Sequence, residues 1–398
     1  MKIYRYLFFF ISIILSFIIP RTNNIVVFGS RNGKRFADNS RYLFFHMNKF
    51  SKKKIVWLTK SNKIKENLRK KNLQCFISHG IIGLYYGFRA KHHVYDYSEY
   101  DTSEFSSINS SKINLGHGIY LKKVKKYRAT NIISLIYNYI VNKNNNYHTY
   151  PNKKYFNHIS KYFPLKKYKL LLSNHPRNYI FSKKKIPNFY FTEDEIKIVN
   201  KIKKTKGKII GYFPTWRQEG YDLFYDLKSK NQLIQLNALL KKKKSFIITK
   251  HHSNIFREDS FTSIDAERVD LLDKELNKLS NIINLDYHID LNSILFYCDL
   301  LISDYSGAIA DFLLSKKPMI IYTPDFNKYN LKPGLNFNYS NFKFGHRANN
   351  FDQCYKYLCL YFKNSQKFSN EYYKNREKIK EVFFKEKTSF EKILNQIN

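Results

Sequence analysis

The chain has 398 residues, enough for two domains of ordinary size, and its 43% hydrophobic and 17% aromatic content excludes a globally disordered protein. The formal net charge of +39 at pH 7 allows nucleic acid, an anionic membrane surface or an anionic substrate as a partner. Lysine runs such as 52–54, 183–185 and 241–244 are most often solvated. Because there is no zinc-finger spacing and no aromatic RNA-recognition motif, we expect no nucleic-acid partner.

The N-terminus carries an apolar run over residues 7–19, which follows Lys2 and Arg5 and ends at Pro20 and Arg21. The run is shorter than the roughly 20 residues that span a bilayer, and no signal-peptide cleavage site follows it. We therefore predict that residues 1–22 form an uncleaved membrane anchor, inserted in one leaflet or marginally spanning. A buried first helix is the alternative that the sequence leaves open.

Short apolar runs then alternate with amphipathic segments. Strands are predicted at residues 25–28, 55–58, 74–77, 93–95 and 112–115, and helices at 39–47 and 63–70. A polar stretch rich in lysine and asparagine, at residues 142–157 and again at 183–187, predicts a connection between two domains. A second series of strands is predicted at residues 209–213, 246–249, 282–285, 300–303 and 319–322.

This alternation is typical of parallel sheets with crossover helices. We therefore expect an α/β protein with two doubly wound, Rossmann-like domains and a cleft between them. The predicted domains are residues 23–185 and 186–365, and a charged helical tail at 366–398 is expected to follow.

A polar turn, Asp-Tyr-Ser-Gly at residues 304–307, separates the strand at 300–303 from a helix predicted at 308–315. Small hydroxyl and glycine residues at the start of a helix present free backbone N–H groups to an anion. This pattern favours a diphosphate as the ligand. Capped helix starts are common in α/β proteins, so the turn alone does not identify an enzyme.

His117 lies between Gly116 and Gly118 directly after the strand predicted at 112–115, and Lys122 and Lys123 follow. Open α/β sheets bind ligands beyond the carboxyl ends of their strands, so we expect His117 to face a ligand. The ordinary pKa of histidine suits proton abstraction from a hydroxyl near neutral pH. An ordinary turn histidine is the alternative at this position.

Three other segments carry cations or imidazole rings. Arg217 ends the segment 214–217, and its planar guanidinium fits phosphate oxygens. The strand at 246–249 runs into Lys250, His251 and His252, where phosphate contact is favoured because no carboxylate or cysteine is spaced to complete a metal site. Arg177 lies in the turn 173–178, for which the local sequence favours a structural role.

Taken together, these segments resemble the CDP-glycerol glycerophosphotransferase family, which includes enzymes that prime and polymerise teichoic acids and related capsule-building transferases. The motifs that carry the resemblance occur in the family's order, at residues 27–30, 116–118, 121–123, 176–178, 214–217, 250–252 and 303–306. The resemblance implies a GT-B pair of domains at the cytoplasmic face of the bacterial plasma membrane. It also implies transfer of a polyol phosphate, glycerol phosphate above all, from a CDP-activated donor to a hydroxyl, with release of CMP.

The resemblance also implies roles and partners. His117 would be the general base, and His252 would stabilise the transferring phosphate. Donor-binding residues would be Arg217, Asp304, Ser306, Gly307, Asp311 and Lys250, and acceptor-side residues would be Lys122, Lys123 and Arg177. The implied partners are CDP-glycerol or CDP-ribitol, an anionic polymer or lipid-linked saccharide as the acceptor, and an anionic membrane surface.

The chain departs from the family's pattern at two places. Ile119 and Tyr120 replace a Thr-Pro pair, and Gly307 replaces a serine, which puts the polyol and the acceptor in doubt. The sequence specifies no metal ligands and no cofactor, and a requirement for Mg²⁺ stays open. A GT-B glycosyltransferase that uses a nucleotide sugar and a non-catalytic polyanion-binding protein are the alternative functions.

Overall fold

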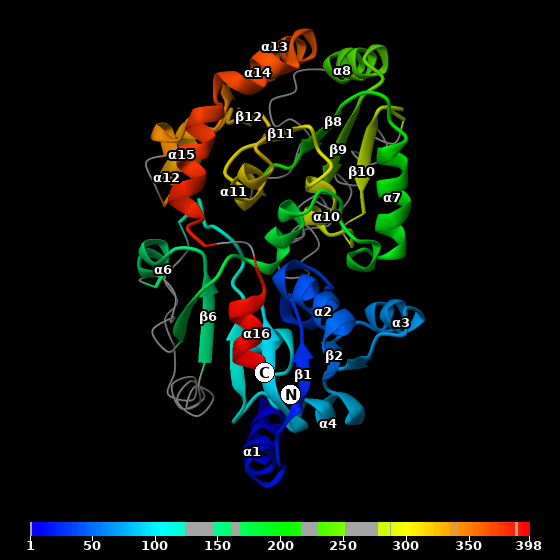
Figure 1. The fold of residues 1–398 in the computed structure, drawn as a ribbon, viewed down its shortest axis with the longest axis vertical. Helices are drawn as coiled ribbons and strands as arrows, with labels where there is room; N and C mark the ends of the chain where they lie inside the picture. Colours follow the sequence, from blue (N-terminus) through cyan, green and yellow to red (C-terminus); the bar gives the residue numbers. More distant parts are fainter. Residues whose placement is uncertain are drawn as a thin grey trace. The chain divides into compact units, whose positions relative to one another are not determined.

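The computed structural model describes residues 2–123, 146–160, 168–215, 230–250, 278–286, 288–336, 339–386 and 389–398. The chain forms two compact units (Figure 1). Unit 1 comprises Met1–Gly118, Lys125–Tyr190 and Phe384–Asn398, and unit 2 comprises Ile119–Val124 and Phe191–Phe383. The predicted division at 185/186 lies near one crossing of the chain, whereas the short excursion of residues 119–124 had no sequence signal.

Unit 1 is built on a parallel sheet, whose described strands are ordered β3-β2-β1-β4-β5-β6-β7. The strand bounds are β1 Thr22–Phe28, β2 Lys54–Thr59, β3 Cys75–Ile77, β4 Ala90–Tyr95, β5 Ser111–Asn114, β6 Asn146–Tyr150 and β7 Lys169–Leu172. Val26, Val27 and Phe28 in β1 are fully buried, as expected for a central parallel strand covered on both faces. The strands predicted between residues 25 and 115 are confirmed, with shifts of a few residues at their ends.

The prediction that residues 142–157 form a connection between domains is wrong where the structure describes them. Asn146–Tyr150 is strand β6, paired in parallel with β5 and β7. Its side chains are polar but buried, and Thr149 donates a hydrogen bond from its hydroxyl to the carbonyl of Leu115, 2.9 Å away. Because its residues are polar, hydrophobic patterning missed this buried strand.

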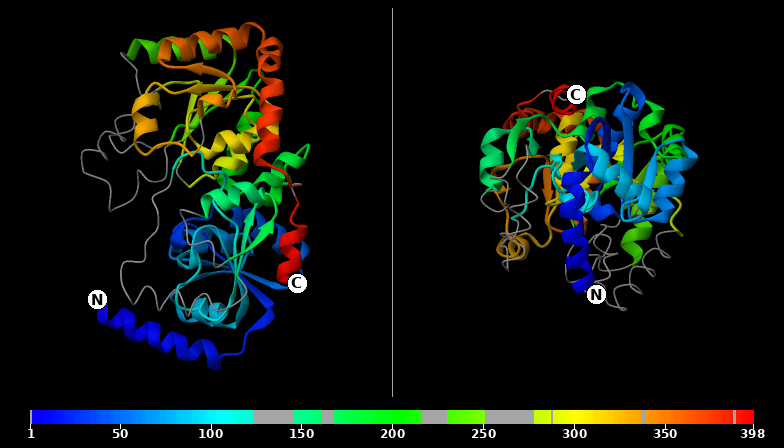
Figure 2. Two further views of the ribbon diagram at one scale, coloured as in Figure 1. Left: turned by 90° about the vertical axis from the view of Figure 1, so that its left-hand side faces the viewer. Right: turned by 90° about the horizontal axis from the view of Figure 1, so that it is seen from below.

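The helices of unit 1 are α1 Lys2–Ile18, α2 Asp38–Phe50, α3 Asn62–Lys70, α4 Ile81–Arg89, α6 Lys153–Ile159 and α16 Glu391–Ile397. Helix α1 lies along the outside of unit 1, next to the amino end of β1 (Figure 2). It buries Ser12 and Ser16, and exposes Phe10 and Phe17 by 63% and 66%. Among the described residues, no helix is long and apolar enough to cross a membrane.

Unit 2 contains a second parallel sheet, whose described strands are ordered β10-β9-β8-β11-β12-β13. The strand bounds are β8 Ile209–Tyr212, β9 Phe246–Lys250, β10 Ile282–Leu285, β11 Leu300–Ser303, β12 Met319–Tyr322 and β13 His346–Ala348. The second predicted series of strands is therefore confirmed, whereas β13 was missed. The expected α/β architecture with two parallel sheets is confirmed as well.

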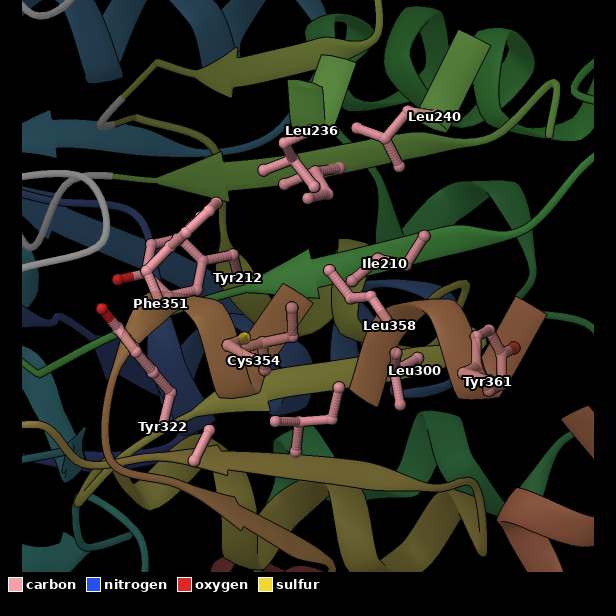
Figure 3. Packing of buried hydrophobic residues seen from close by; sticks show 14 of the residues in the cluster. Ile210, Tyr212, Leu236, Leu240, Leu300, Tyr322, Phe351, Cys354, Leu358 and Tyr361 are labelled. Carbon is pink, nitrogen blue, oxygen red and sulfur yellow. The ribbon is translucent and has the colours of Figure 1, made fainter. Parts of the chain in front are cut away.

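The helices of unit 2 are α7 Glu193–Lys203, α8 Lys230–Lys242, α10 Leu291–Leu295, α11 Gly307–Phe312, α12 Phe326–Leu331, α13 Phe351–Lys363, α14 Ser365–Glu371 and α15 Tyr373–Phe383. One face of the sheet packs against α8 and α13 through Ile210, Leu236, Leu300 and Leu358, which are buried to 1% exposure or less (Figure 3). Each such leucine or isoleucine contributes about 1.5–3 kcal/mol through burial. This core holds the strand ends at which the polar turn of unit 2 is built.

Candidate active site

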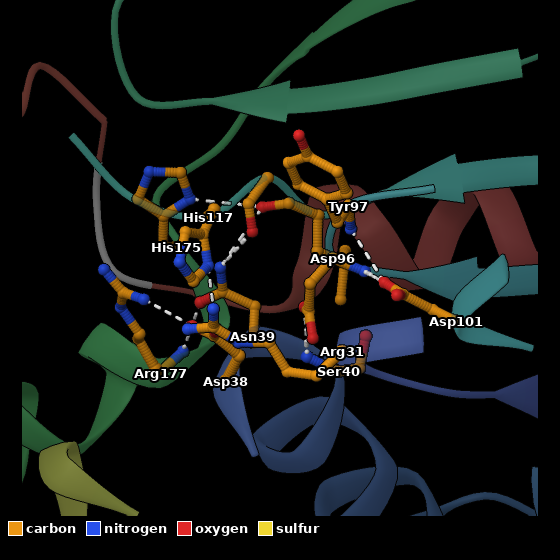
Figure 4. Close-up of polar contacts among 12 residues, drawn as sticks. Arg31, Asp38, Asn39, Ser40, Asp96, Tyr97, Asp101, His117, His175 and Arg177 are labelled. Carbon is orange, nitrogen blue, oxygen red and sulfur yellow. Dashed lines mark hydrogen bonds and ion pairs between the residues drawn. The ribbon is translucent and has the colours of Figure 1, made fainter. Parts of the chain in front are cut away.

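Unit 1 reverses its strand order between β1 and β4, and open α/β sheets bind ligands at the carboxyl ends of strands beside such a reversal. The chain leaves β1 through the short 3₁₀ helix Arg31–Gly33 and enters α2 at Asp38. His117 follows β5, and Arg177 lies in the 3₁₀ helix Pro176–Ser182. Three separate segments therefore meet at this edge of the sheet (Figure 4).

His117 and Asp38 form a close pair. The Nδ1 atom of His117 lies 2.8 Å from Oδ2 of Asp38. The side chain of Asp38 is 4% exposed, whereas that of His117 is 28% exposed, so the carboxylate is buried while the imidazole ring reaches solvent. Because Nδ1 contacts Asp38, Nε2 is the ring nitrogen on the far side from the carboxylate.

Two arginines share the carboxylate of Asp38. Arg177 Nη1 lies 2.5 Å from Oδ1, and Arg31 Nη2 lies 2.9 Å from Oδ2. Burial alone would raise the pKa of Asp38, but the charges of His117, Arg31 and Arg177 hold it well below its ordinary value. Burial and the charge of Arg31 lower the pKa of His117, and the charge of Asp38 opposes them. A neutral imidazole beside an ionised carboxylate is the state that a general base requires.

Asn39, the neighbour of Asp38, holds the backbone of the histidine turn. Its Nδ2 donates to the carbonyl of Gly116 at 2.7 Å, and its Oδ1 accepts from the amide of Arg177 at 3.2 Å. Both glycines of the turn have left-handed backbones, with φ of +69° at Gly116 and +102° at Gly118. A Cβ at Gly118 would lie 2.0 Å from Arg177 Nη2, so the guanidinium of Arg177 would have to shift if residue 118 carried a side chain.

The start of α2 is fixed by Asp96, at the end of β4. Ala37 precedes the helix and offers no side-chain cap, and Asp96 Oδ1 accepts the amide of Ser40 at 2.8 Å instead. Burial and the nearby charges of Asp38 and Asp101 raise the pKa of Asp96 well above its ordinary value. One ionised carboxylate, Asp38, therefore lies beside a carboxyl group that resists ionisation.

In unit 2 the predicted polar turn lies at the corresponding strand reversal, between β8 and β11. Ser306 caps α11 by accepting the amide of Ala308 at 3.3 Å, and Gly307 is the first residue of that helix. Asp304 points back into the protein: its carboxylate accepts the amide of Thr215 at 2.8 Å and the hydroxyl of Thr215 at 2.7 Å. Asp304 thus ties the turn to the segment that leads into Arg217.

The remaining predicted residues are placed as follows. Arg217 and His252 lie outside the described residues, as does His251. Lys250 ends β9 and donates from Nζ to the carbonyl of Ile289. Asp311 is buried in α11.

The residues predicted on the acceptor side fall in different units. Lys122 and Lys123 belong to unit 2, and Arg177 belongs to unit 1, where it is paired with Asp38. Within unit 1 the structure brings together His117 and Arg177, and within unit 2 it groups Asp304, Ser306 and Gly307.

The sequence assigned no role to Asp38, Asn39, Asp96 or Thr215. Asp38 and Asn39 are the first residues of α2, the first α-helix after β1, and a carboxylate beyond a central strand end was the available signal. The pairing of Asp38 with His117 joins residues far apart in sequence, so no local pattern could reveal it.

Removal of the Thr215 hydroxyl tests the tie to Asp304. We expect Thr215→Val to destabilise the protein by about 1.5–3 kcal/mol, because a charge-assisted hydrogen bond is lost in a buried place. It should also raise the KM for the expected nucleotide donor, since the segment before Arg217 then keeps only its backbone hydrogen bond to Asp304. Urea unfolding and donor titration measure both effects. Thr215→Ser keeps the hydroxyl and should behave like the wild type; equal KM values for both variants would contradict the expectation.

The profile of the CDP-Glycerol:Poly(glycerophosphate) glycerophosphotransferase family matches residues 11–398. The chain belongs to this family. It is therefore a glycerophosphotransferase-type enzyme, and the resemblance carried by the motifs around His117 and residues 304–307 is confirmed at the level of the family.

Characterised relatives are similar over most of the chain. A teichoic acid poly(glycerol phosphate) polymerase of Bacillus spizizenii is 25% identical over 78% of this chain and 77% of its own length. A teichoic acid glycerol-phosphate transferase of Staphylococcus aureus is 22% identical over 77% of this chain and 75% of its own length. The solved wall teichoic acid polymerase TagF shares the fold, with a TM-score of 0.68 and 19% identity over 95% of this chain and 88% of that one.

Proposed function

We propose that this glycerophosphotransferase moves a polyol phosphate from a CDP-polyol to a hydroxyl of a cell-envelope polymer or lipid-linked acceptor and releases CMP. The observation that carries the proposal is the His117–Asp38 pair, a buried carboxylate holding a solvent-reaching imidazole at a strand reversal. Relatives that act on glycerol phosphate polymers, and a TagF variant soaked with CDPG, support the donor class.

The reaction needs a base and a site for phosphate charge. We infer that Nε2 of His117 takes the proton of the acceptor hydroxyl as its oxygen attacks the polyol-bearing phosphorus. The bond from that phosphorus to the bridging oxygen breaks, and CMP leaves with this oxygen. Charge grows on the phosphoryl oxygens, which fixed N–H donors and cations stabilise. The amides at Ser306 and Gly307 are the proposed donors, and Arg217, Lys250 and His252 are the proposed cationic or imidazole contacts.

We also propose which polyol the CDP-activated donor carries. Ribitol-phosphate polymerases of Staphylococcus aureus match shorter parts of the chain, at 29% and 31% identity over 40% and 34% of it. The relatives that match most of the chain carry glycerol phosphate in their names, so we propose CDP-glycerol as the preferred donor and CDP-ribitol as the second. The proposed acceptors are anionic cell-envelope polymers, either teichoic acid or capsule polymers.

The nucleotide product decides the reaction class. Purified full-length enzyme is incubated with CDP-glycerol, CDP-ribitol and UDP-sugars, each with a membrane or oligosaccharide acceptor and with or without Mg²⁺. Release of CMP from a CDP-polyol, dependent on the acceptor, is the expected result. Release of UDP with no CMP from any donor would establish the glycosyltransferase alternative, which family membership does not favour.

We also propose that the enzyme acts at the cytoplasmic face of the plasma membrane, with α1 lying in the lipid interface. The apolar side of α1 is the exposed side: Phe10, Ile14 and Phe17 are 63%, 46% and 66% exposed. Its polar side faces the protein, where Asn109 donates to the carbonyl of Ser16 at 3.2 Å. The net charge of +39 favours anionic lipid.

Substitution on the exposed side of α1 tests this placement. Replacing both Phe10 and Phe17 by aspartate should lower binding to anionic phospholipid vesicles by at least about 100-fold, since each buried phenylalanine contributes about 1.5–3 kcal/mol. Co-sedimentation with vesicles measures the effect. Ile234→Asp changes an apolar residue of unit 2 that is 57% exposed and serves as the control. Equal losses in the two proteins would exclude a specific role for α1.

A further inference from the structure

Of the two arginines that share the carboxylate of Asp38, Arg31 is the one that reaches solvent. Its side chain is 32% exposed, whereas that of Arg177 is 7% exposed. Among the described residues, its guanidinium has a single polar partner, Oδ2 of Asp38, and its buried Nε atom has no hydrogen-bond partner. Because a guanidinium carries five N–H donors, Arg31 keeps donors that can bind a ligand.

The backbone that carries Arg31 has an unusual conformation. Arg31, Asn32 and Gly33 are left-handed in succession, with φ of +51°, +55° and +73°. Residues other than glycine rarely adopt this region, so the first two positions cost free energy that the surrounding contacts must offset. Backbone strain of this kind clusters at active sites and ligand-binding sites, which makes this loop a candidate for a ligand contact.

Hydrogen bonds within unit 1 hold this loop at two points. The amide of Asn32 donates to Oδ1 of Asp101 at 2.6 Å, and the other oxygen of that carboxylate accepts the amide of Tyr97, just beyond β4, at 2.9 Å. The carbonyl of Gly33 accepts the hydroxyl of Thr59, the last residue of β2, at 2.7 Å. The loop is therefore tied to the carboxyl ends of two strands, and these ties place Arg31 beside Asp38.

Arg31 and His117 contact the same oxygen atom. Nη2 of Arg31 and Nδ1 of His117 lie 2.9 Å and 2.8 Å from Oδ2 of Asp38. A hydroxyl that reaches this imidazole therefore brings the groups next to it close to the guanidinium. In an acceptor built of polyol phosphates, only the polyol carbons separate the terminal hydroxyl from the phosphodiester that precedes it.

We infer that Arg31 is a specificity-determining residue, which binds the phosphate that adjoins the acceptor hydroxyl. The inference rests on the proposed function, because it takes His117 as the base. A planar guanidinium can contact a carboxylate through one N–H and phosphate oxygens through others, so the ion pair with Asp38 is compatible with this role. Arg177 is too buried for the same contact, and its role is to hold Asp38.

The test measures CMP release by the full-length enzyme from CDP-glycerol, with a soluble oligomer of glycerol phosphate as the acceptor. Arg31→Gln should raise the KM for the oligomer at least about 10-fold, because a charged hydrogen bond is lost, and leave the KM for CDP-glycerol within about twofold. Arg31→Lys keeps the charge without the planar fork and should have an intermediate KM. Arg31→Asn gives the same comparison if the Gln variant does not fold, since asparagine tolerates a left-handed backbone.

The pH profile provides a second readout. The charge of Arg31, together with burial, lowers the pKa of His117, so Arg31→Gln should move the rising limb of kcat/KM to higher pH. Asp38 and Arg177, the other charged groups that act on His117, are unchanged in this variant. Arg31→Lys should leave the limb close to its place in the wild type.

The matched control is Lys34→Gln, which removes an exposed cation from the same loop. It should leave the KM for the oligomer and the pH profile unchanged. The inference is overturned if Arg31→Gln and Lys34→Gln have equal KM values for the oligomer. It is also overturned if Arg31→Gln raises the KM for CDP-glycerol alone, which would assign the guanidinium to the donor diphosphate. Failure of the proposed function is distinguishable, because the wild type itself would then release no CMP.

Discussion

Replacement of His117 by alanine is expected to lower kcat for CMP release by about 10²–10⁴-fold, the usual contribution of a positioned general base. Donor binding should persist, because the proposed phosphate contacts at Ser306 and Gly307 belong to unit 2 and do not involve the imidazole. Steady-state CMP release and equilibrium binding of CDP-glycerol measure the two quantities separately.

His79→Ala is a suitable control for this experiment. His79 is also a histidine of unit 1 with a carboxylate partner, Glu104, at 3.4 Å, and it is 39% exposed. Its loss should leave kcat within a small factor of the wild type. Unchanged turnover in His117→Ala would remove His117 from the mechanism and would leave the fold and family assignment untouched.

Asp38→Asn is expected to lower kcat by about 10²–10⁴-fold with the imidazole still present. An amide in place of the carboxylate can donate to Nδ1, and the ring then carries its proton on Nε2, where it cannot act as a base. The variant also leaves Arg31 and Arg177 without their shared negative partner, which burial makes costly. Glu104→Gln removes another buried carboxylate of unit 1 and controls for the loss of charge alone.

The dependence of kcat/KM on pH distinguishes loss of the Asp38–His117 pair from simple unfolding of the Asp38→Asn variant. In the wild type, kcat/KM should rise with pH through the pKa of His117, which burial and Arg31 lower from its ordinary value, and should level off by neutral pH. The charge of Asp38 raises the pKa of His117, so its removal should move the rising limb of the residual activity to lower pH. A limb that stays in place or moves to higher pH would contradict the pairing.

Hydrophobic patterning predicted most of the strands because the central ones are buried on both faces. Residues 26–28 and 300–303 are near-continuous apolar runs, and both proved to be strands. The strands β6 and β13 were not predictable in this way. Asn-Tyr-His-Thr-Tyr in β6 and His-Arg-Ala in β13 have the composition of polar loops, and they form strands only through pairing with β5, β7 and β12 in the folded sheets.

Site residues could be predicted from the sequence where a single segment contains the whole motif. His117 between two glycines and the turn at 304–307 could both be recognised, since each lies at a strand end with its own local signature. The carboxylate that orients His117 could not be assigned, because the contact joins Asp38 at the start of α2 to a turn almost eighty residues later. Asp304 was expected at the donor, and its tie to Thr215 became visible only through the pairing of β8 with β11.

Residues 384–398 belong to unit 1, although the whole of Phe191–Phe383, which belongs to unit 2, precedes them in the sequence. The ring of Phe390 lies 4.3 Å from the ring of Tyr179, and Lys53 donates to the carbonyl of Ile397 at 2.9 Å. Loss of residues 384–398 would therefore remove contacts of unit 1 and leave every residue of unit 2 in place.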